Sequence, residues 1–161
     1  MNSAKPQIKK ASPVQWISFW KSKKNLLFLS AILIISFMVY LPSLQNEFVN
    51  WDDQVNIYEN SYITNISNWE SFSESVKVIF TTRLYGYYKP LVILSFAFEK
   101  MIYGLDRPGL WHLNNIILHL ICVLLVFRIA LALELKIIPA AFCALLFGIH
   151  PMRVESVAWI T

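Results

Sequence analysis

Two adjacent carboxylates are the residues of this chain best suited to chemistry. Asp52 and Asp53 end the segment 48–53 (FVNWDD), a few residues after the first long uncharged run of the sequence. A carboxylate near a low-dielectric surface can act as a general base toward an incoming hydroxyl. Neighbouring carboxylates on a loop point in different directions, so one can face a substrate while the other accepts a supporting hydrogen bond. The ordinary alternative is an Asx-rich turn in a solvated loop.

A lysine at a predicted helix start is the second candidate. Lys89 follows Tyr88 and precedes Pro90, which suits the first turn of a helix. The free N–H groups and positive dipole end of a helix N-terminus favour an anion, here a lipid-linked phosphate at the headgroup level. The alternative is a lysine that reaches toward water beside interfacial tyrosines.

Polar residues also follow one face of a later apolar run. His112, Asn115, His119 and Cys122 recur at helical spacing, which favours hydrogen bonding between membrane helices. His112, at the outer end, could belong to a site instead. Two helical turns separate it from His119, which disfavours a metal site.

A last polar group comes after the final apolar run and comprises His150, Arg153 and Glu155. Arg153 can bind a phosphate bidentately, and Glu155 can orient it or share acid–base work. A surface ion pair after a helix is the alternative.

The composition predicts an integral membrane protein. The chain is 57% apolar and only 15% charged, whereas about a quarter of a soluble domain is charged. Six lysines and no acid occupy 1–24, a bias that indicates a cytoplasmic N-terminus and not a nucleic-acid footprint. Cys122 and Cys143 lie inside apolar runs without metal-ligand spacing, and they say little about redox compartment.

Uncharged runs predict three membrane helices, over 25–42, 108–133 and 137–150. The first is predicted to be an uncleaved anchor that follows a basic cytoplasmic arm, because no small-residue cleavage site comes after it; a signal peptide is the alternative. The third should end near Ile149, since Pro151 disfavours helix in the residue before it.

The segment 43–107 is then a large extracytoplasmic loop that carries short helices. Apolar residues at helical spacing predict an amphipathic helix capped by Ser67 or Asn68. The segment 90–103 is too short to span and is predicted to lie at the outer surface. With three membrane helices and no span over 90–103, the segment 151–161 lies on the same side of the membrane as the acidic pair.

Four motifs in order carry a family resemblance: FVNWDD (48–53), YYKPLVILSF (87–96), YGLDRPGLWHLNNIILH (103–119) and LLFGIHPMRVESVAWI (145–160). Together they resemble the N-terminal part of the transmembrane and tetratricopeptide-repeat (TPR) O-mannosyltransferases and their bacterial relatives, within the GT-C glycosyltransferases. The resemblance implies an all-α membrane bundle of GT-C type. It also implies a longer protein with further helices and TPR repeats, of which this chain alone would be inactive.

The resemblance implies an inverting transferase that moves a sugar, expected to be mannose, from polyprenyl phosphate to a hydroxyl acceptor, expected to be protein Ser or Thr. By the resemblance, Asp52 or Asp53 matches the acidic catalytic motif and is expected to be the base, and Lys89 matches a basic residue near the donor phosphate. His150, Arg153 and Glu155 match the last motif. Arg153 is expected to act with Lys89 at the departing phosphate, and the expected supporting residues are Tyr88, His112, His150 and Glu155. No residue is assigned to a metal, although paired acids would permit a divalent ion.

The expected partners are the lipid bilayer, the lipid-linked sugar and an acceptor polypeptide or glycan, with no nucleic acid. A bacterial cytoplasmic membrane is the expected location, with the endoplasmic reticulum membrane as the alternative. A non-catalytic membrane scaffold is the rival function. A transporter ranks last, because it would place charged residues deep within the spans.

Overall fold

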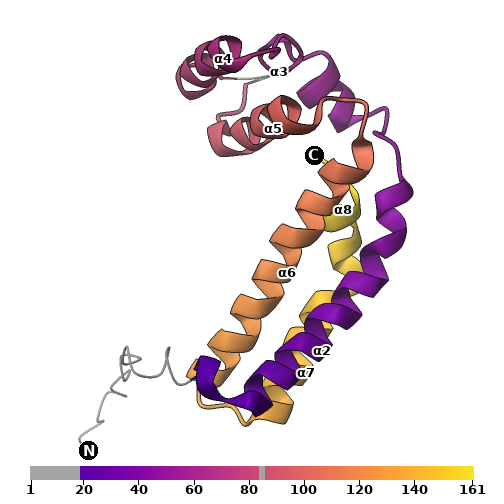
Figure 1. The fold of residues 1–161 in the computed structure, drawn as a ribbon, viewed down its shortest axis with the longest axis vertical. Coiled ribbons are helices and arrows are strands. Elements are labelled where there is room, and N and C mark those ends of the chain that lie inside the picture. The colour runs from indigo at the N-terminus through magenta and orange to yellow at the C-terminus, as the bar shows by residue number, and fades with distance from the viewer. Residues whose placement is uncertain (1–18, 84–85) are drawn as a thin grey trace, which may run out of the picture. The chain divides into compact units, whose positions relative to one another are not determined.

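The computed structural model describes residues 19–83 and 86–161, so most of the predicted basic arm (1–24) lies outside the described residues. The described residues form helices and no strand, and the prediction of an all-α fold is confirmed. In chain order (Figure 1) the elements are α2 (Lys23–Tyr40), η1 (Leu41–Gln45), η2 (Gln54–Tyr58), α3 (Ser61–Thr64), α4 (Trp69–Thr81), α5 (Pro90–Tyr103), α6 (Pro108–Ala132), α7 (Ile137–Ile149), η3 (Pro151–Arg153) and α8 (Val154–Ala158).

Two segments of the described chain are long and apolar enough to cross a membrane. They are Lys23–Gln45 and Pro108–Ala132, and a third is counted if the bent pair Ile137–Ile149 and Pro151–Ala158 is taken as one span. The expectation of about three spans agrees with this range. Which side of the membrane each loop occupies stays a prediction.

Local sequence signals account for several helix ends. The Asn68 side chain accepts a hydrogen bond from the Ser71 backbone, and the Ser71 hydroxyl accepts one in return from the Asn68 backbone, which is a capping box. Pro90 opens α5, and Gly104 ends it at a φ of 71°, a left-handed conformation that glycine tolerates best. These ends agree with the sequence prediction.

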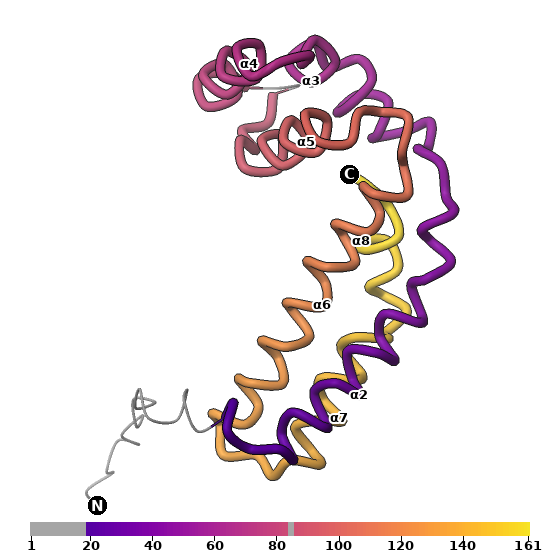
Figure 2. The backbone as a smooth tube through the Cα atoms, in the orientation of Figure 1, coloured from indigo at the N-terminus to yellow at the C-terminus, as the bar shows by residue number. Residues whose placement is uncertain are grey.

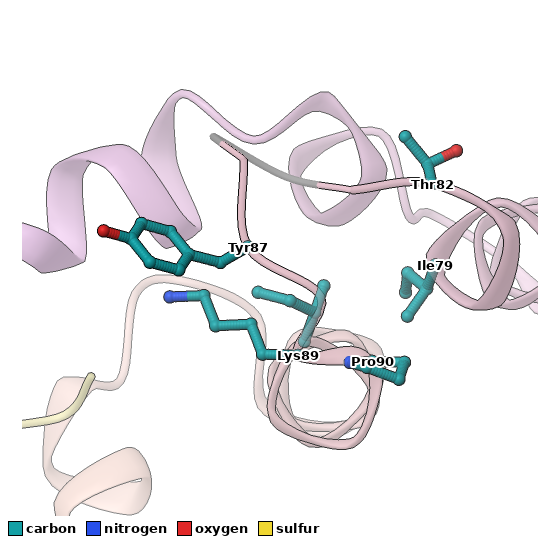
Figure 3. Close-up of a pocket in the computed structure, with 6 residues that line it drawn as sticks. Ile79, Thr82, Tyr87, Lys89 and Pro90 are labelled. Carbon is teal, nitrogen blue, oxygen red and sulfur yellow. The ribbon is translucent and has the colours of Figure 1, made fainter.

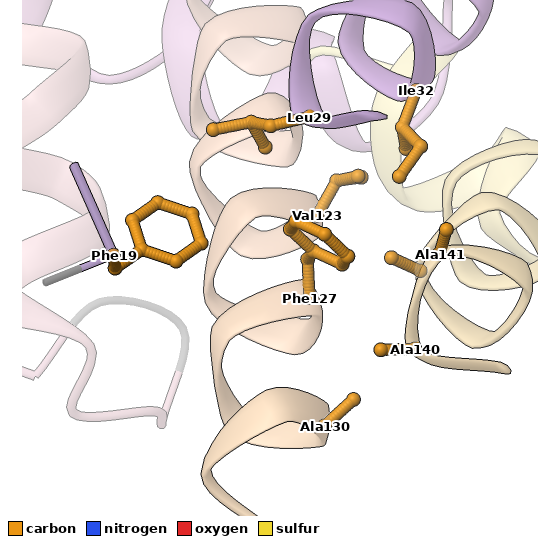
Figure 4. Packing of buried hydrophobic residues seen from close by; sticks show 9 residues of the cluster. Phe19, Leu29, Ile32, Val123, Phe127, Ala130, Ala140 and Ala141 are labelled. Atoms are coloured by element: carbon orange, nitrogen blue, oxygen red, sulfur yellow. The ribbon is translucent and has the colours of Figure 1, made fainter. Parts of the chain in front are cut away.

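The chain divides into two compact units. The described part of the first comprises 19–38 and 120–150, and that of the second comprises 39–83, 86–119 and 151–161. The first unit has an apolar core in which Phe127 and Val123 of α6 face α2 and small residues of α7 (Figure 4). Arg128 covers this core, with its guanidinium carbon 4.6 Å from the centre of the Phe19 ring.

Small side chains let α2 and α7 approach closely in the first unit. A Cβ atom at Gly148 would collide with the hydroxyl of Ser36 and would lie 3.2 Å from Val123 Cγ2. Ser36 is buried, and its hydroxyl has no hydrogen-bond partner among the described residues. Glycine at 148 is therefore required by the packing, as is common where membrane helices meet.

The second unit has its own core beneath the predicted outer loop. Helices α4 and α5 pack against each other, and α3 contacts both (Figure 2). The buried residues of this core are Ile57, Ile63, Ile66, Ile79, Ile93, Phe96, Ala97, Trp111 and Ile160. Most of them lie within the loop, and Trp111 and Ile160 come after it, so the loop is folded onto the start of α6 and the residues after α8.

A buried carboxyl group of the second unit lies on α5. Glu99 of α5 is only 5% exposed and accepts a hydrogen bond from the Asn114 amide of α6. Burial raises the pKa of Glu99 from 4.5 to about 7, and the hydrogen bond from Asn114 lowers it by less. The carboxyl therefore changes charge near neutral pH.

The unfolding of the second unit is expected to depend on this group. The pKa of Glu99 is higher in the folded protein than in the unfolded chain. The contribution of Glu99 to the free energy of unfolding is therefore complete below pH 4.5 and is lost as the pH rises through about 7. The loss is on the order of 3 kcal/mol. Thermal unfolding of the detergent-solubilised protein should show a lower midpoint at pH 8 than at pH 5.

Glu99→Gln should flatten that dependence between pH 5 and 8. Glu70→Gln, which changes an exposed acid on α4, is the matched control and should keep the wild-type slope. A Glu99→Gln variant with an undiminished slope would contradict the assignment.

Candidate active site

The acidic pair begins a helical turn after a tight bend. The Trp51 backbone donates to Val49 O at 2.9 Å, and the chain then turns into η2, a π-helical turn. Single π-helical turns are often found at functional sites. Phe48, at the start of the segment, packs edge-on against Trp111 of α6 and Tyr58 of η2, with ring centres 5.4 and 5.2 Å apart. The acidic segment is thereby fixed to the core of the second unit.

The two aspartates lie in different environments. Asp53 is 0% exposed, and both of its oxygens accept hydrogen bonds, from the Val49 backbone at 2.9 Å and from the Thr161 hydroxyl at 2.7 Å. Asp52 is exposed. Its carbonyl accepts a hydrogen bond from the buried Asn56 side chain at 2.9 Å, which fixes its backbone and leaves its carboxylate facing solvent. Only Asp52 is open to an incoming hydroxyl.

His112 lies beside Asp53. The ring is 2% exposed, and Asp53 is close enough for an electrostatic interaction with it. Backbone groups of Glu47 and Asn46 also lie close enough to hydrogen-bond the ring. The ring of His112 therefore interacts both with the acidic segment and with the residues just before it.

The surroundings of the acidic pair are electronegative. The hydroxyl of Tyr58 has a raised pKa because of burial first, and then because of the negative charges of Glu47, Asp53 and Asp106. A phosphate near these acids would need a compensating positive charge.

Lys89 is the N-cap residue of α5 and is half-buried. It lines a shallow hollow together with Ile79, Thr82, Tyr87, Pro90 and Ile93. The Lys89 side chain extends alongside the Tyr87 ring (Figure 3). The hollow is open to solvent and is too shallow to enclose a water molecule. Neither Asp52 nor Asp53 lines this hollow.

Tyr88 has a structural contact in the same segment. Its hydroxyl donates to Phe80 O at 3.1 Å, which connects the start of α5 to the end of α4. The ring itself is exposed.

The polar group after α7 is divided by the structure. His150, exposed at the end of α7, belongs to the first unit, whereas Arg153 and Glu155 belong to the second and are exposed. Arg153 lies close enough to the hydroxyl of Tyr40 for an electrostatic interaction. Arg153 is therefore placed near the end of α2.

Thr161, which contacts the acidic segment, and Asn115, which bonds the residues just before Thr161, were not predicted as site residues. Thr161 donates to Asp53 from 108 positions away, and no local pattern marks it. Asn115 was expected to bond between helices; its amide donates to Trp159 O at 2.6 Å and to Ile160 O at 3.2 Å. Its position three residues after His112 was the one available signal, because it places both on one helix face.

Metal ligands were considered among the same side chains. Within 19–83 and 86–161, no three His, Cys, Asp or Glu side chains lie together as a metal site would require. A divalent ion with fewer protein ligands stays a prediction.

The fold and these residues define a class: an all-helical, multi-pass membrane protein segment with one exposed and one buried aspartate in a folded loop. Comparison with known proteins is more specific. The chain is 31% identical over 129 residues to protein O-mannosyl-transferase Tmtc2 of Drosophila melanogaster. The aligned stretch covers 78% of this chain and 14% of that protein. It is 29% identical over 140 residues to protein O-mannosyl-transferase Tmtc1 of the same organism, an alignment that covers 85% of this chain and 16% of that protein. It is 32% identical over 130 residues to protein O-mannosyl-transferase TMTC1 of Mus musculus, with 78% of this chain and 14% of that protein covered.

The predicted resemblance to the TMTC proteins is confirmed by these relatives. The chain spans about one seventh of their length. No family model and no solved structure matches it. The membrane location is supported, whereas the expectation of a bacterial cytoplasmic membrane is not, since the relatives are from a fly and a mouse.

Proposed function

We propose that this chain is part of a membrane mannosyltransferase that transfers mannose from a polyprenyl-phosphate donor to a hydroxyl of an acceptor polypeptide, with inversion. The observation that carries the proposal is the exposure of Asp52 beside a buried, doubly hydrogen-bonded Asp53. The names of the relatives, protein O-mannosyl-transferases, support the reaction class.

The proposed step uses Asp52 as general base. Asp52 takes the proton of the acceptor hydroxyl, and the hydroxyl oxygen bonds to the anomeric carbon from the side opposite the phosphate. The bond from that carbon to the phosphate oxygen breaks, and its electron pair leaves with the polyprenyl phosphate. Asp53 holds the acidic segment in place and does not itself take the proton.

Lys89 and Arg153 are proposed to stabilise the charge on the departing phosphate, where fixed positive groups are most effective. The electronegative surroundings of Tyr58 support the need for such groups. Tyr88, His112, His150 and Glu155 are proposed as supporting residues. Of these, His112 has the strongest case, because it is buried beside Asp53.

The proposal requires a topology in which the acidic loop faces the non-cytoplasmic side. We place 1–24 in the cytoplasm, membrane helices over 25–42, 108–133 and 137–150, and the segments 43–107 and 151–161 outside. The endoplasmic reticulum membrane, the alternative location expected from the sequence, fits animal relatives better than a bacterial membrane does.

The test is transfer of labelled mannose from polyprenyl-phosphate mannose by the full-length protein in membranes. We expect transfer to a hydroxyl-bearing polypeptide by the wild type, and none above background by the double variant Asp52→Asn, Asp53→Asn. Nucleotide-activated mannose serves as the control donor and should not be used directly. Wild-type transfer by the double variant would refute the proposal.

A further inference from the structure

The three residues that follow α8 form a strap over the acidic segment. The strap (159–161) is held by α6, because the Asn115 amide donates to two successive carbonyls, those of Trp159 and Ile160. One side chain that bonds two adjacent carbonyls fixes both the position and the direction of the backbone between them.

An apolar anchor completes the attachment of the strap. Ile160 is buried in the core of the second unit, in the same cluster as Ile57 and Trp111. The strap therefore cannot slide along α6 without exposing Ile160 to water. Thr161, the next residue, is directed by this anchor toward Asp53.

Thr161 of the strap contacts the acidic pair. The Thr161 hydroxyl donates to Asp53 Oδ1 at 2.7 Å, while the Val49 backbone donates to Asp53 Oδ2 at 2.9 Å. Two donors on the two oxygens leave the carboxylate no free rotation about its terminal bond. Asp52 shares its backbone with Asp53, so the direction of the Asp52 side chain depends on this restraint.

We propose that Asn115 and Thr161 are positioning residues that fix the acidic pair through Asp53, so that Asp52 is held at a constant angle to an acceptor hydroxyl. This inference rests on the proposed function for its effect on activity. The restraint on Asp53 can be measured without any activity.

The first measurement is kinetic, with the full-length protein. Thr161→Val keeps the shape of the side chain and removes its donor, so we expect kcat for mannose transfer to fall about tenfold. The KM for the donor lipid should change less than about twofold, because the substitution removes a restraint on Asp53 and no residue proposed to hold the donor phosphate. Thr161→Ser restores the hydroxyl and should regain at least half of the wild-type kcat.

Thr64→Val is the matched control. Thr64 is a half-buried threonine of the same unit, and its hydroxyl donates to the Asn60 backbone, away from the acidic pair. It should keep the wild-type kcat. A Thr161→Val variant with wild-type kcat, or a Thr161→Ser variant as impaired as Thr161→Val, would overturn the inference.

The second measurement is chemical and separates the inference from the proposed function. Carbodiimide modification read by mass spectrometry should label Asp52 and spare Asp53 in the wild-type protein. Thr161→Val should increase the labelling rate of Asp53 severalfold, and Thr64→Val should not. Asn115→Asp, which keeps the shape but cannot donate to the two carbonyls, should act like Thr161→Val.

The outcomes are distinguishable. If the wild type transfers no mannose but Asp53 becomes reactive in Thr161→Val, the proposed function fails and the restraint stands. If Asp53 is equally protected in Thr161→Val and the wild type, the strap does not position the acidic pair, whatever the activity.

Discussion

Replacing Asp52 with asparagine is expected to lower kcat for mannose transfer by about 10²- to 10⁴-fold, the usual contribution of a positioned general base. Asparagine has nearly the same shape as aspartate, but it cannot take the proton of the acceptor hydroxyl. Because the Asp52 side chain is exposed, the change removes no packing. The midpoint of thermal unfolding should therefore stay within the error of the measurement.

Asp53→Asn should behave differently, and this difference is the sharper part of the prediction. Both Asp53 oxygens accept hydrogen bonds, so an asparagine that keeps the bond from the Val49 backbone turns its NH2 group toward the Thr161 hydroxyl, whose own proton then loses its acceptor. Leaving one buried donor unpaired costs about 1–3 kcal/mol, and we expect a loss of stability of this size.

The two single variants are measured side by side, in transfer assays and in unfolding of the detergent-solubilised protein. Glu59→Gln, at an exposed acid a few residues further on, is the control and should change neither quantity. The assignment of the base to Asp52 would be wrong if Asp52→Asn transferred mannose at the wild-type rate while Asp53→Asn was inactive and fully stable.

Local signals were sufficient for most of the helices. The apolar runs that became α2 and α6 are long enough to identify by length alone, and α7 ends at Ile149, two residues before Pro151, as proline geometry requires. The caps of α4 and α5 were also predictable, because a capping side chain or a glycine acts on neighbours within four residues.

The sequence could not show which of the two aspartates is buried and which is exposed. The segment FVNWDD allows either carboxylate to turn inward, and the choice depends on contacts with Trp111 and Thr161, which are distant along the chain. Tertiary contacts of this kind leave no periodicity to detect. Lys89 could be placed at a helix start because Pro90 is its neighbour in the sequence. The position of Lys89 relative to the acidic pair could not be predicted, because it depends on tertiary contacts.

Trp111→Ala is expected to cause the largest loss of stability of any change in the second unit. Trp111 is fully buried, with Phe48 and Phe96 rings centred 5.4 and 6.2 Å away, and its indole N–H donates to Gly104 O at 3.0 Å. Removing a buried tryptophan typically costs about 3–5 kcal/mol. The apolar contacts are lost, and the surrounding side chains fill the remaining cavity only partly.

The measurement is denaturant unfolding in detergent, with two companion variants. Trp111→Phe keeps most of the apolar contact and loses the hydrogen bond to Gly104, so a loss of about 1 kcal/mol is expected. Trp69→Ala removes a tryptophan that is 67% exposed, and it should cost much less than Trp111→Ala. Equal losses for the two alanine variants would contradict the burial of Trp111.

The same variant tests how the acidic segment is supported. Phe48 is attached to the core through Trp111 and Tyr58, so Trp111→Ala should release the segment even where the helices remain folded. Carbodiimide labelling of Asp53 should therefore rise in Trp111→Ala at denaturant concentrations below the unfolding transition, and stay low in Trp69→Ala. If Asp53 stayed protected in Trp111→Ala, the backbone and Thr161 hydrogen bonds would by themselves be sufficient to hold the acidic pair, and the aromatic contact would be packing alone.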